Sequence, residues 1–162
     1  MDADLTLPLS PIMAVEPAWI DYNGHLNMAY YNVFFDRAAD AVFEHLGLGP
    51  DYVKTRAMSY MTAEIHVCYL REIFLETPVR VRLRVLDVDD KRLHVFSELL
   101  HAEEGWVSAT SEQMYLHVDM TARRTAPWPL EIRAGFEAMK RAADALPRPE
   151  RAGRAIGIPR RG

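Results

Sequence analysis

The strongest constraint on the fold is one long amphipathic helix that precedes a run of strands. Over residues 29–46, apolar side chains recur at spacings of three and four, while charged side chains fall on the opposite face. Asn27 is a favourable N-cap residue just ahead of the first turn, and Gly47, followed by Gly49-Pro50, is typical of a helix end. We therefore expect a helix over residues 29–46.

The segments after this helix alternate between apolar and polar residues, which is the period of a strand. Four strands are expected, over residues 58–70, 79–85, 93–99 and 106–118. The middle two flank the turn signal Asp89-Asp90 and should form a hairpin within a run of antiparallel hairpins. A shorter strand is expected over residues 12–16, and a second helix over residues 130–146.

One helix cannot cover both faces of a sheet with four or five strands. An antiparallel sheet wrapped around one long apolar helix, with a C-terminal helix added, satisfies the pattern, so the predicted class is α+β. A second copy would bury the uncovered face or edge, which predicts at least a homodimer. The expected single domain covers residues 1–146. Residues 147–162 carry five arginines and one glutamate among prolines and glycines, and we expect a flexible basic tail there.

Composition excludes several classes of protein. The chain has 162 residues, 49% of them hydrophobic, and no run of the roughly 20 apolar residues that cross a bilayer. A single cysteine, Cys68, cannot form an internal disulfide, and the six histidines are dispersed, so we expect neither a metal nor a redox cofactor. The N-terminus lacks the basic region of a secretory signal, which makes the cytoplasm the expected location. A net charge of −4 argues against general nucleic-acid binding.

The segment from Trp19 to Tyr31 combines a carboxylate, a flexible turn and the start of the predicted helix. The N–H groups of a first helical turn can bind an anion, and acyl transfer needs such donors where negative charge develops on a carbonyl oxygen. Asp21, held nearby, can serve as a base or a nucleophile. The alternative from spacing alone is that Asp21 caps its own turn and that His25 is a structural hydrogen-bonding group.

The pattern Asp21-x-x-Gly24-His25-x-Asn27, followed by Tyr30-Tyr31, resembles the entry motif of hotdog-fold acyl-CoA thioesterases of the 4-hydroxybenzoyl-CoA thioesterase type. The resemblance extends over about residues 12–130. Within that family, the stretches 59–66, 90–96 and 109–114 are similar to thioesterases of carnitine breakdown that are thought to act on betainyl-CoA. The resemblance implies a hotdog fold, an acyl-CoA substrate, and a homodimer or homotetramer without a cofactor.

The resemblance also implies roles for residues of the loop. Asp21 would be the catalytic carboxylate, attacking the thioester carbonyl or activating water, and the backbone N–H of Met28 would polarise that carbonyl. Gly24, His25 and Asn27 belong to the same motif and are expected to contact the substrate. Some relatives have a catalytic histidine at the position of Met28, whereas this chain has His25 three residues earlier.

A cationic acyl group would suit the expected polar face of strand 58–70. If Tyr60 and Glu64 share that face, an aromatic ring and a carboxylate would bind a trimethylammonium group through cation–π attraction and charge pairing. A solvated sheet surface or a dimer seam would explain the same pattern. Asp36, on the polar helix face, is the reserve catalytic carboxylate, although solvation is the ordinary explanation of that face.

Two further features are candidates with simpler explanations. Arg80, Arg82, Arg84 and the tail arginines are candidates for contacts with the phosphates of coenzyme A, but such stripes are commonly the solvated face of a strand. Cys68 is expected to be a buried structural thiol. Two other functions share the expected fold: a non-catalytic acyl-CoA-binding protein, and a dehydratase with an acid on its helix opposite a loop histidine.

Overall fold

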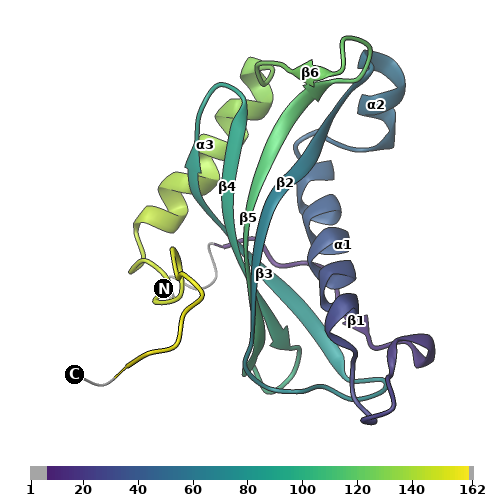
Figure 1. Cartoon of the computed structure of the whole chain (residues 1–162). Helices are drawn as coiled ribbons and strands as arrows, with labels where there is room; N and C mark the ends of the chain where they lie inside the picture. The colour runs from purple at the N-terminus through teal and green to yellow at the C-terminus, as the bar shows by residue number, and fades with distance from the viewer. Residues whose placement is uncertain (1–6, 161–162) are drawn as a thin grey trace.

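Residues 7–160 are described by the computed structural model (Figure 1). The first six residues of the predicted domain and the last two of the predicted tail lie outside this range. The sheet contains β1 (Met13–Ala14), β2 (Met58–Tyr69), β3 (Pro78–Val88), β4 (Arg92–His101), β5 (Val107–Asp119) and β6 (Arg124–Thr125). The helices are η2 (Pro17–Trp19), η3 (Met28–Tyr30), α1 (Tyr31–Glu44), α2 (Pro50–Arg56) and α3 (Leu130–Asp144).

The sheet is antiparallel throughout, and its strands lie in the order β1-β3-β4-β5-β2, with β6 beside β5. The predicted hairpin of β3 and β4 is confirmed, and β4 and β5 form a second one. The expectation that all four long strands follow one another in hairpins is wrong, because β2 lies on the far side of β5. Residues 70–77 are too long a connection for a tight hairpin turn and span the end of the sheet instead.

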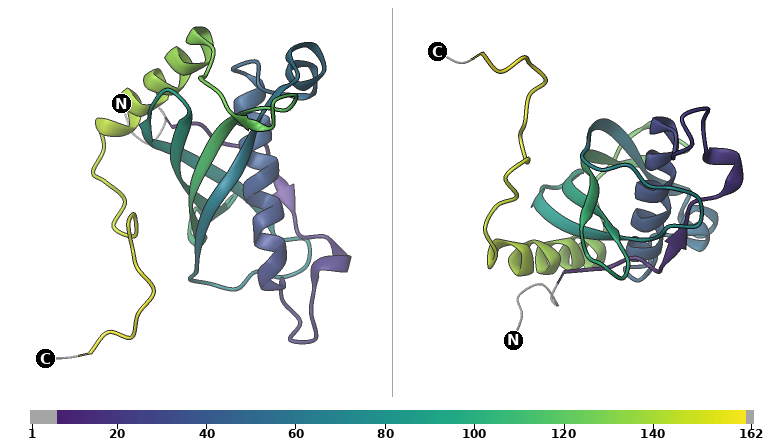
Figure 2. Two further views of the ribbon diagram at one scale, coloured as in Figure 1. Left: turned by 45° about the horizontal axis from the view of Figure 1, so that its top comes forward. Right: turned by 90° about the horizontal axis from the view of Figure 1, so that it is seen from below.

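Helix α1 is the predicted central helix, and the sheet curls around it (Figure 2). Its entry is the short 3₁₀ helix η3, whose N-cap Asn27 accepts a hydrogen bond from the N–H of Ala29 through its side chain at 3.0 Å. The helix ends two residues earlier than expected. Helix α2 was not predicted, because Gly49-Pro50 was interpreted only as a helix end, whereas proline is equally favourable at the first position of a new helix.

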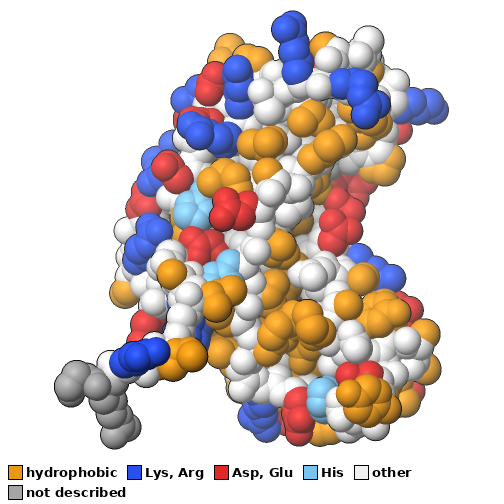
Figure 3. All heavy atoms as spheres, viewed as in Figure 1, with side chains coloured by type: hydrophobic (Ala, Val, Ile, Leu, Met, Phe, Trp, Pro, Cys, Tyr) orange, Lys and Arg blue, Asp and Glu red, His pale blue; other side chains and the backbone are white. Residues whose placement is uncertain are grey.

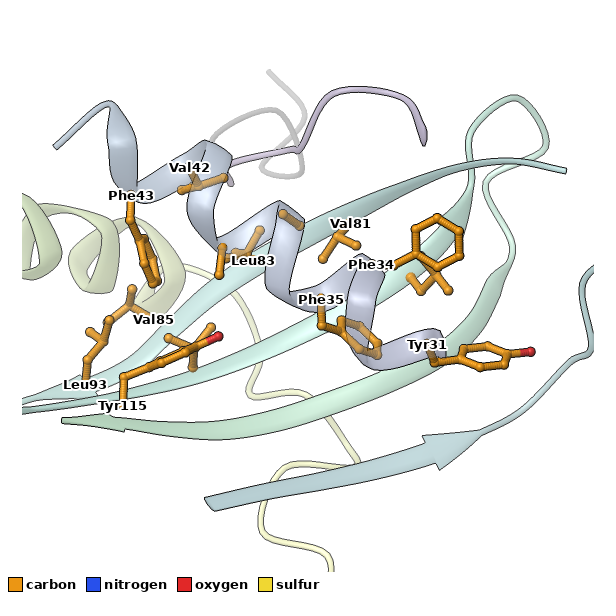
Figure 4. Close-up of a cluster of buried hydrophobic side chains, with 14 of the residues drawn as sticks. Tyr31, Phe34, Phe35, Val42, Phe43, Val81, Leu83, Val85, Leu93 and Tyr115 are labelled. Carbon is orange, nitrogen blue, oxygen red and sulfur yellow. The ribbon is translucent and has the colours of Figure 1, made fainter. Parts of the chain in front are cut away.

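The core lies between α1 and the inner face of the sheet (Figure 4). From the helix, Phe34 and Phe43 point toward the strands and are fully buried. The facing strand residues include Val81, Leu83, Val85, Leu93 and Tyr115. Each fully buried side chain of this size contributes about 1.5–3 kcal/mol to stability. The alternation of β3 and β4 therefore places their apolar residues against the helix, as predicted.

Helix α3 closes the core beside β3 and the C-terminal end of α1. The rings of Phe136 and Phe43 meet edge to face with their centroids 5.2 Å apart. Gly135 allows this close approach, since a Cβ atom there would lie 2.7 Å from Cδ2 of Leu46. The expected arrangement of an antiparallel sheet around one long helix, plus a C-terminal helix, is thus confirmed. No helix in residues 7–160 is long and apolar enough to cross a membrane.

Candidate active site

The loop before α1 is closed by its own backbone. The N–H of Asp21 donates to the carbonyl of His25 at 3.1 Å, and the N–H of Gly24 donates to the carbonyl of Asp21 at 3.0 Å. Gly24 has a φ of +82°, a left-handed conformation that favours glycine. Leu26 is buried and donates its N–H to the carbonyl of Ile73 at 2.9 Å, which fixes the loop to the connection between β2 and β3.

Asp21 is half-buried, and both of its carboxylate oxygens are engaged within this loop. One oxygen accepts the backbone N–H of Asn23 at 2.8 Å, and the other accepts Nδ2 of Asn27 at 3.4 Å. Because Asn27 also caps the helix, it ties the carboxylate to the first turn. Asp21 therefore closes its own turn, as the alternative reading expected. A carboxylate has about four lone-pair positions, so these two bonds leave it able to accept a proton.

Met28 is the first residue of η3, where a backbone N–H has no acceptor within the helix. Its side chain is 63% exposed. Its carbonyl accepts a hydrogen bond from the hydroxyl of Tyr69, on β2, at 3.0 Å. The helix start is thereby held both by the Asp21 loop and by the edge strand β2. The contact with Tyr69 was not predicted from the sequence.

A cavity of about 260 Å³ lies beside this helix start. Of the predicted motif residues, His25 and Met28 line it, together with Tyr31 and Tyr69 from α1 and β2. Nδ1 of His25 lies 3.2 Å from the carbonyl of Leu26, and its Nε2 lies 3.8 Å from a carboxylate oxygen of Glu72. Burial raises the pKa of the Tyr31 hydroxyl, which stays protonated at neutral pH. The predicted loop residues are thus brought together at one end of α1.

A larger cavity of about 500 Å³ lies between α1, α2 and β2. Asp36, Asp40 and Glu44, spaced by four residues along α1, line it from one side. Tyr52 and Tyr60 line it as well. Figure 3 shows acidic side chains gathered in a notch on this side of the molecule. The spacing of four is visible in the sequence, where solvation is the ordinary explanation of this helix face and Asp36 is the reserve catalytic carboxylate.

The carboxylates of this cavity affect one another and Tyr60. The hydroxyl of Tyr60 donates a short hydrogen bond to Oδ1 of Asp40. Burial and this bond both raise the pKa of Tyr60. Burial, reinforced by the charge of Asp40, also raises the pKa of Asp36. None of the three carboxylates forms an ion pair within residues 7–160, and only the charge of Arg37 acts to lower the pKa of Asp36, so the cavity is predominantly acidic.

The predicted shared face of Tyr60 and Glu64 is wrong. The register of β2 shifts by one residue between Thr62, opposite Tyr115, and Glu64, opposite Met114. Such a bulge moves every following side chain to the other face of the sheet. Tyr60 therefore faces α1, where its ring contacts Phe43 at 5.3 Å between centroids, while Glu64 lies on the outer face. The carboxylate beside Tyr60 is that of Asp40.

The remaining candidates have contacts within the chain. Arg80 donates to the carbonyl of Ser10 at 3.1 Å, Arg82 pairs with Glu98 at 3.0 Å, and Arg84 donates to the carbonyl of Pro147 at 3.1 Å. No group of three possible metal-ligating side chains occurs in the described residues.

The expectation that Cys68 is a buried thiol is wrong. It is partly exposed on the outer face of the sheet, with its sulfur 3.8 Å from Nε2 of His66.

Comparison with known proteins agrees with this architecture. Residues 15–136 match the thioesterase-like superfamily. A betainyl-CoA thioesterase from Pseudomonas aeruginosa is 40% identical over 159 residues, which cover 98% of each chain. An L-carnitine dehydrogenase/betainyl-CoA thioesterase from Rhizobium meliloti is 37% identical over 143 residues, and the match covers 88% of this chain but 29% of that longer protein.

A solved structure has the same fold over nearly the whole chain. It is a Staphylococcus aureus protein in complex with CoA, which superposes with a TM-score of 0.86 at 29% sequence identity. The superposition covers 94% of this chain and 96% of the other. Because the family match includes α1, its preceding loop and every long strand, the chain belongs to the thioesterase-like superfamily and is a thioester hydrolase.

Proposed function

We propose that this protein hydrolyses betainyl-CoA to betaine and coenzyme A, with Asp21 as the catalytic carboxylate. The single observation that carries the mechanism is the Asp21–Asn27 hydrogen bond, which ties a carboxylate to the start of the helix. The name of the Pseudomonas aeruginosa relative supports the choice of substrate. The other proposed substrate contacts of the loop are Gly24, His25 and Asn27, and the proposed location is the cytoplasm.

In the proposed reaction, the thioester oxygen accepts a hydrogen bond from the backbone N–H of Met28. Asp21 either takes a proton from water, whose oxygen attacks the carbonyl carbon, or attacks that carbon itself and forms a mixed anhydride that water then cleaves. In both routes the carbon–sulfur bond breaks and the CoA thiolate leaves and is protonated. The N–H of Met28 stabilises the negative charge on the oxygen while that bond is breaking.

A second copy of the chain completes the proposed site. β2 is an edge strand, and Met61 and Ile65 in its middle are 50% and 41% exposed. An open edge of this kind is a template for pairing with another strand. Two β2 strands related by a two-fold axis run antiparallel, so the end of β2 near Met28 in one copy meets the end that carries Tyr60 in the other.

This pairing places the helix start of one copy beside the acidic cavity of the other. Met28 and Asp36 are eight residues apart, about 12 Å along a helix, so one copy cannot hold both ends of a betainyl group, whose cation is two bonds from its carbonyl carbon. In the proposed dimer, the ring of Tyr60 and the carboxylates of Asp36 and Asp40 bind the trimethylammonium group. Glu64 stays outside this site because it lies on the outer face.

The test compares thiol release from betainyl-CoA and from 3,3-dimethylbutanoyl-CoA, which has the same branched shape but no charge. We expect kcat/KM for betainyl-CoA to be higher by a factor between about 5 and about 150, because a charge pair in a partly exposed site contributes about 1–3 kcal/mol. Equal values would reject the cationic substrate while leaving thioester hydrolysis in place. Failure to release thiol from betainyl-CoA would reject the proposed reaction.

A further inference from the structure

The chain after α3 crosses the outer face of the sheet in a defined direction. The carbonyl of Pro147 accepts Nη1 of Arg84, on β3, at 3.1 Å. Further along, the N–H of Gly153 donates to Oε2 of Glu112, on β5, at 2.7 Å. The strands lie in the order β3-β4-β5-β2, so the segment moves from the closed side of the sheet toward its open edge.

The acceptor of the second contact is itself held by a neighbouring strand. The other oxygen of Glu112 lies 2.7 Å from Nε2 of His94, on β4, and the side chain of Glu112 is only 15% exposed. A carboxylate fixed between two strands in this way accepts the Gly153 N–H with a set direction. The chain therefore leaves β5 from a constrained position.

Residues 154–160, here named the C-terminal arm, continue beyond this contact without packing on the body. Ile156 and Ile158 are 91% and 85% exposed. Their spacing of two puts both side chains on one face of an extended segment. All views in Figures 1 and 2 show the arm standing away from the sheet and helices. Two aligned isoleucines of this exposure form an apolar surface that residues 7–160 of the same chain leave uncovered.

The length of the arm is sufficient to pass the open edge. Seven extended residues span roughly 23 Å, whereas β2 lies only about 5 Å beyond β5. A surface that lies beyond β2 therefore lies within reach of Ile156 and Ile158. In the dimer of the proposed function, that surface is the outer sheet face of the second copy.

We propose that the C-terminal arm docks on the outer sheet face of a second copy of this chain, across the β2 edge. The inference rests on the β2-paired dimer of the proposed function. On that face, the exposed Met61 offers apolar contact for the isoleucines, and Glu64 supplies negative charge. Arg154 and Arg160 flank the two isoleucines, so the arm matches this face in both apolar character and charge.

The direct test is photo-crosslinking of the full-length protein with p-benzoylphenylalanine in place of Ile158. We expect a covalent product of twice the chain mass, with the crosslinked peptide in β2 or β5. A mixture of isotopically heavy and light chains identifies crosslinks between copies, because their peptides combine both labels. The matched control places the same group at Leu130, which is 83% exposed at the start of α3. It should give no crosslinked dimer.

A second measurement uses the double variant Ile156→Asp/Ile158→Asp. Sedimentation should show its dimer dissociation constant raised by at least about tenfold, since two apolar side chains per copy lose their burial. The control Leu130→Asp should leave the constant unchanged. Crosslinks found only within one chain, or a monomeric wild-type protein, would overturn the proposed docking.

The same preparations are assayed for thiol release from betainyl-CoA, so that the two proposals can fail separately. Hydrolysis without crosslinks between copies rejects the arm and leaves the reaction standing. Crosslinks between copies without hydrolysis confirm the arm and reject the reaction.

Discussion

The acidic cavity gives a quantitative prediction for substrate choice through the variant Asp40→Asn. The substitution removes one charge from the cavity of about 500 Å³ but keeps the size of the side chain. It also keeps an oxygen that can accept the Tyr60 hydroxyl. Changes in activity should therefore reflect charge, with little change in packing.

The magnitude follows from Coulomb's law. A cation about 5 Å from the carboxylate is stabilised by about 3 kcal/mol at an effective dielectric constant of 20, and by about 1 kcal/mol at the value of water. Loss of this electrostatic stabilisation corresponds to a decrease in kcat/KM by a factor between about 5 and about 150. Asp36 and Glu44 remain in the variant, and the cavity is open to solvent, so we expect a value of about tenfold.

The assay is the ratio of kcat/KM for betainyl-CoA to that for 3,3-dimethylbutanoyl-CoA. Asp40→Asn should lower this ratio by lowering only the value for betainyl-CoA. The control Glu103→Gln removes an exposed carboxylate in the turn between β4 and β5 and should leave the ratio unchanged. An unaltered ratio in a folded, active Asp40→Asn enzyme would refute the role of this cavity.

Three further predictions concern the loop, the cavity and the core. Asn27→Ala removes both the helix cap and the Asp21 contact, so it should lower the free energy of unfolding by about 1 kcal/mol in urea titrations and reduce kcat. Asn27→Ser keeps a capping oxygen and should keep most of the stability, so equal stability of the two variants would contradict the capping role. Asp36→Asn should raise the free energy of unfolding at pH 7, because the folded-state pKa of Asp36 is raised and its ionisation opposes folding. This gain in stability should shrink as the pH falls toward 3.8, the ordinary pKa of an aspartate, and a gain independent of pH would rule out this cause. Phe43→Ala should lower the free energy of unfolding by about 3–5 kcal/mol in the same titration, since the ring is fully buried against Phe136 and Tyr115. A decrease below about 1 kcal/mol would show that the contact between α1 and α3 contributes little to stability.

Periodicity in the sequence predicted the individual strands and helices better than it predicted which strands lie side by side. The predicted alternation of apolar and polar residues in β3 and β4 is confirmed, because one face of each strand packs against α1. The position of β2 beyond β5 depends on a pairing between distant residues, which local patterns do not encode. The bulge after Thr62 reversed the faces of the second half of β2, and with it the predicted partner of Tyr60.

The loop motif could be identified from the sequence because its contacts are local. Asp21, Asn23 and Asn27 lie within seven residues, and their hydrogen bonds follow from turn and capping chemistry. The acidic cavity could not be identified in this way. Asp36 and Asp40 line a hollow only because α2 and β2 fold over that side of α1, which no short pattern in the helix indicates.

The central claim is that Asp21 performs the chemistry, and the most direct measurement is kcat of Asp21→Asn with betainyl-CoA at saturating concentration. The variant keeps an oxygen for the Asn23 N–H and loses only the longer 3.4 Å contact with Asn27, so its melting temperature should stay close to that of the wild type. Loss of base or nucleophilic catalysis should lower kcat by about a hundredfold or more. A variant that folds normally and turns over betainyl-CoA at a near-normal rate would contradict the claim and direct attention to Asp36.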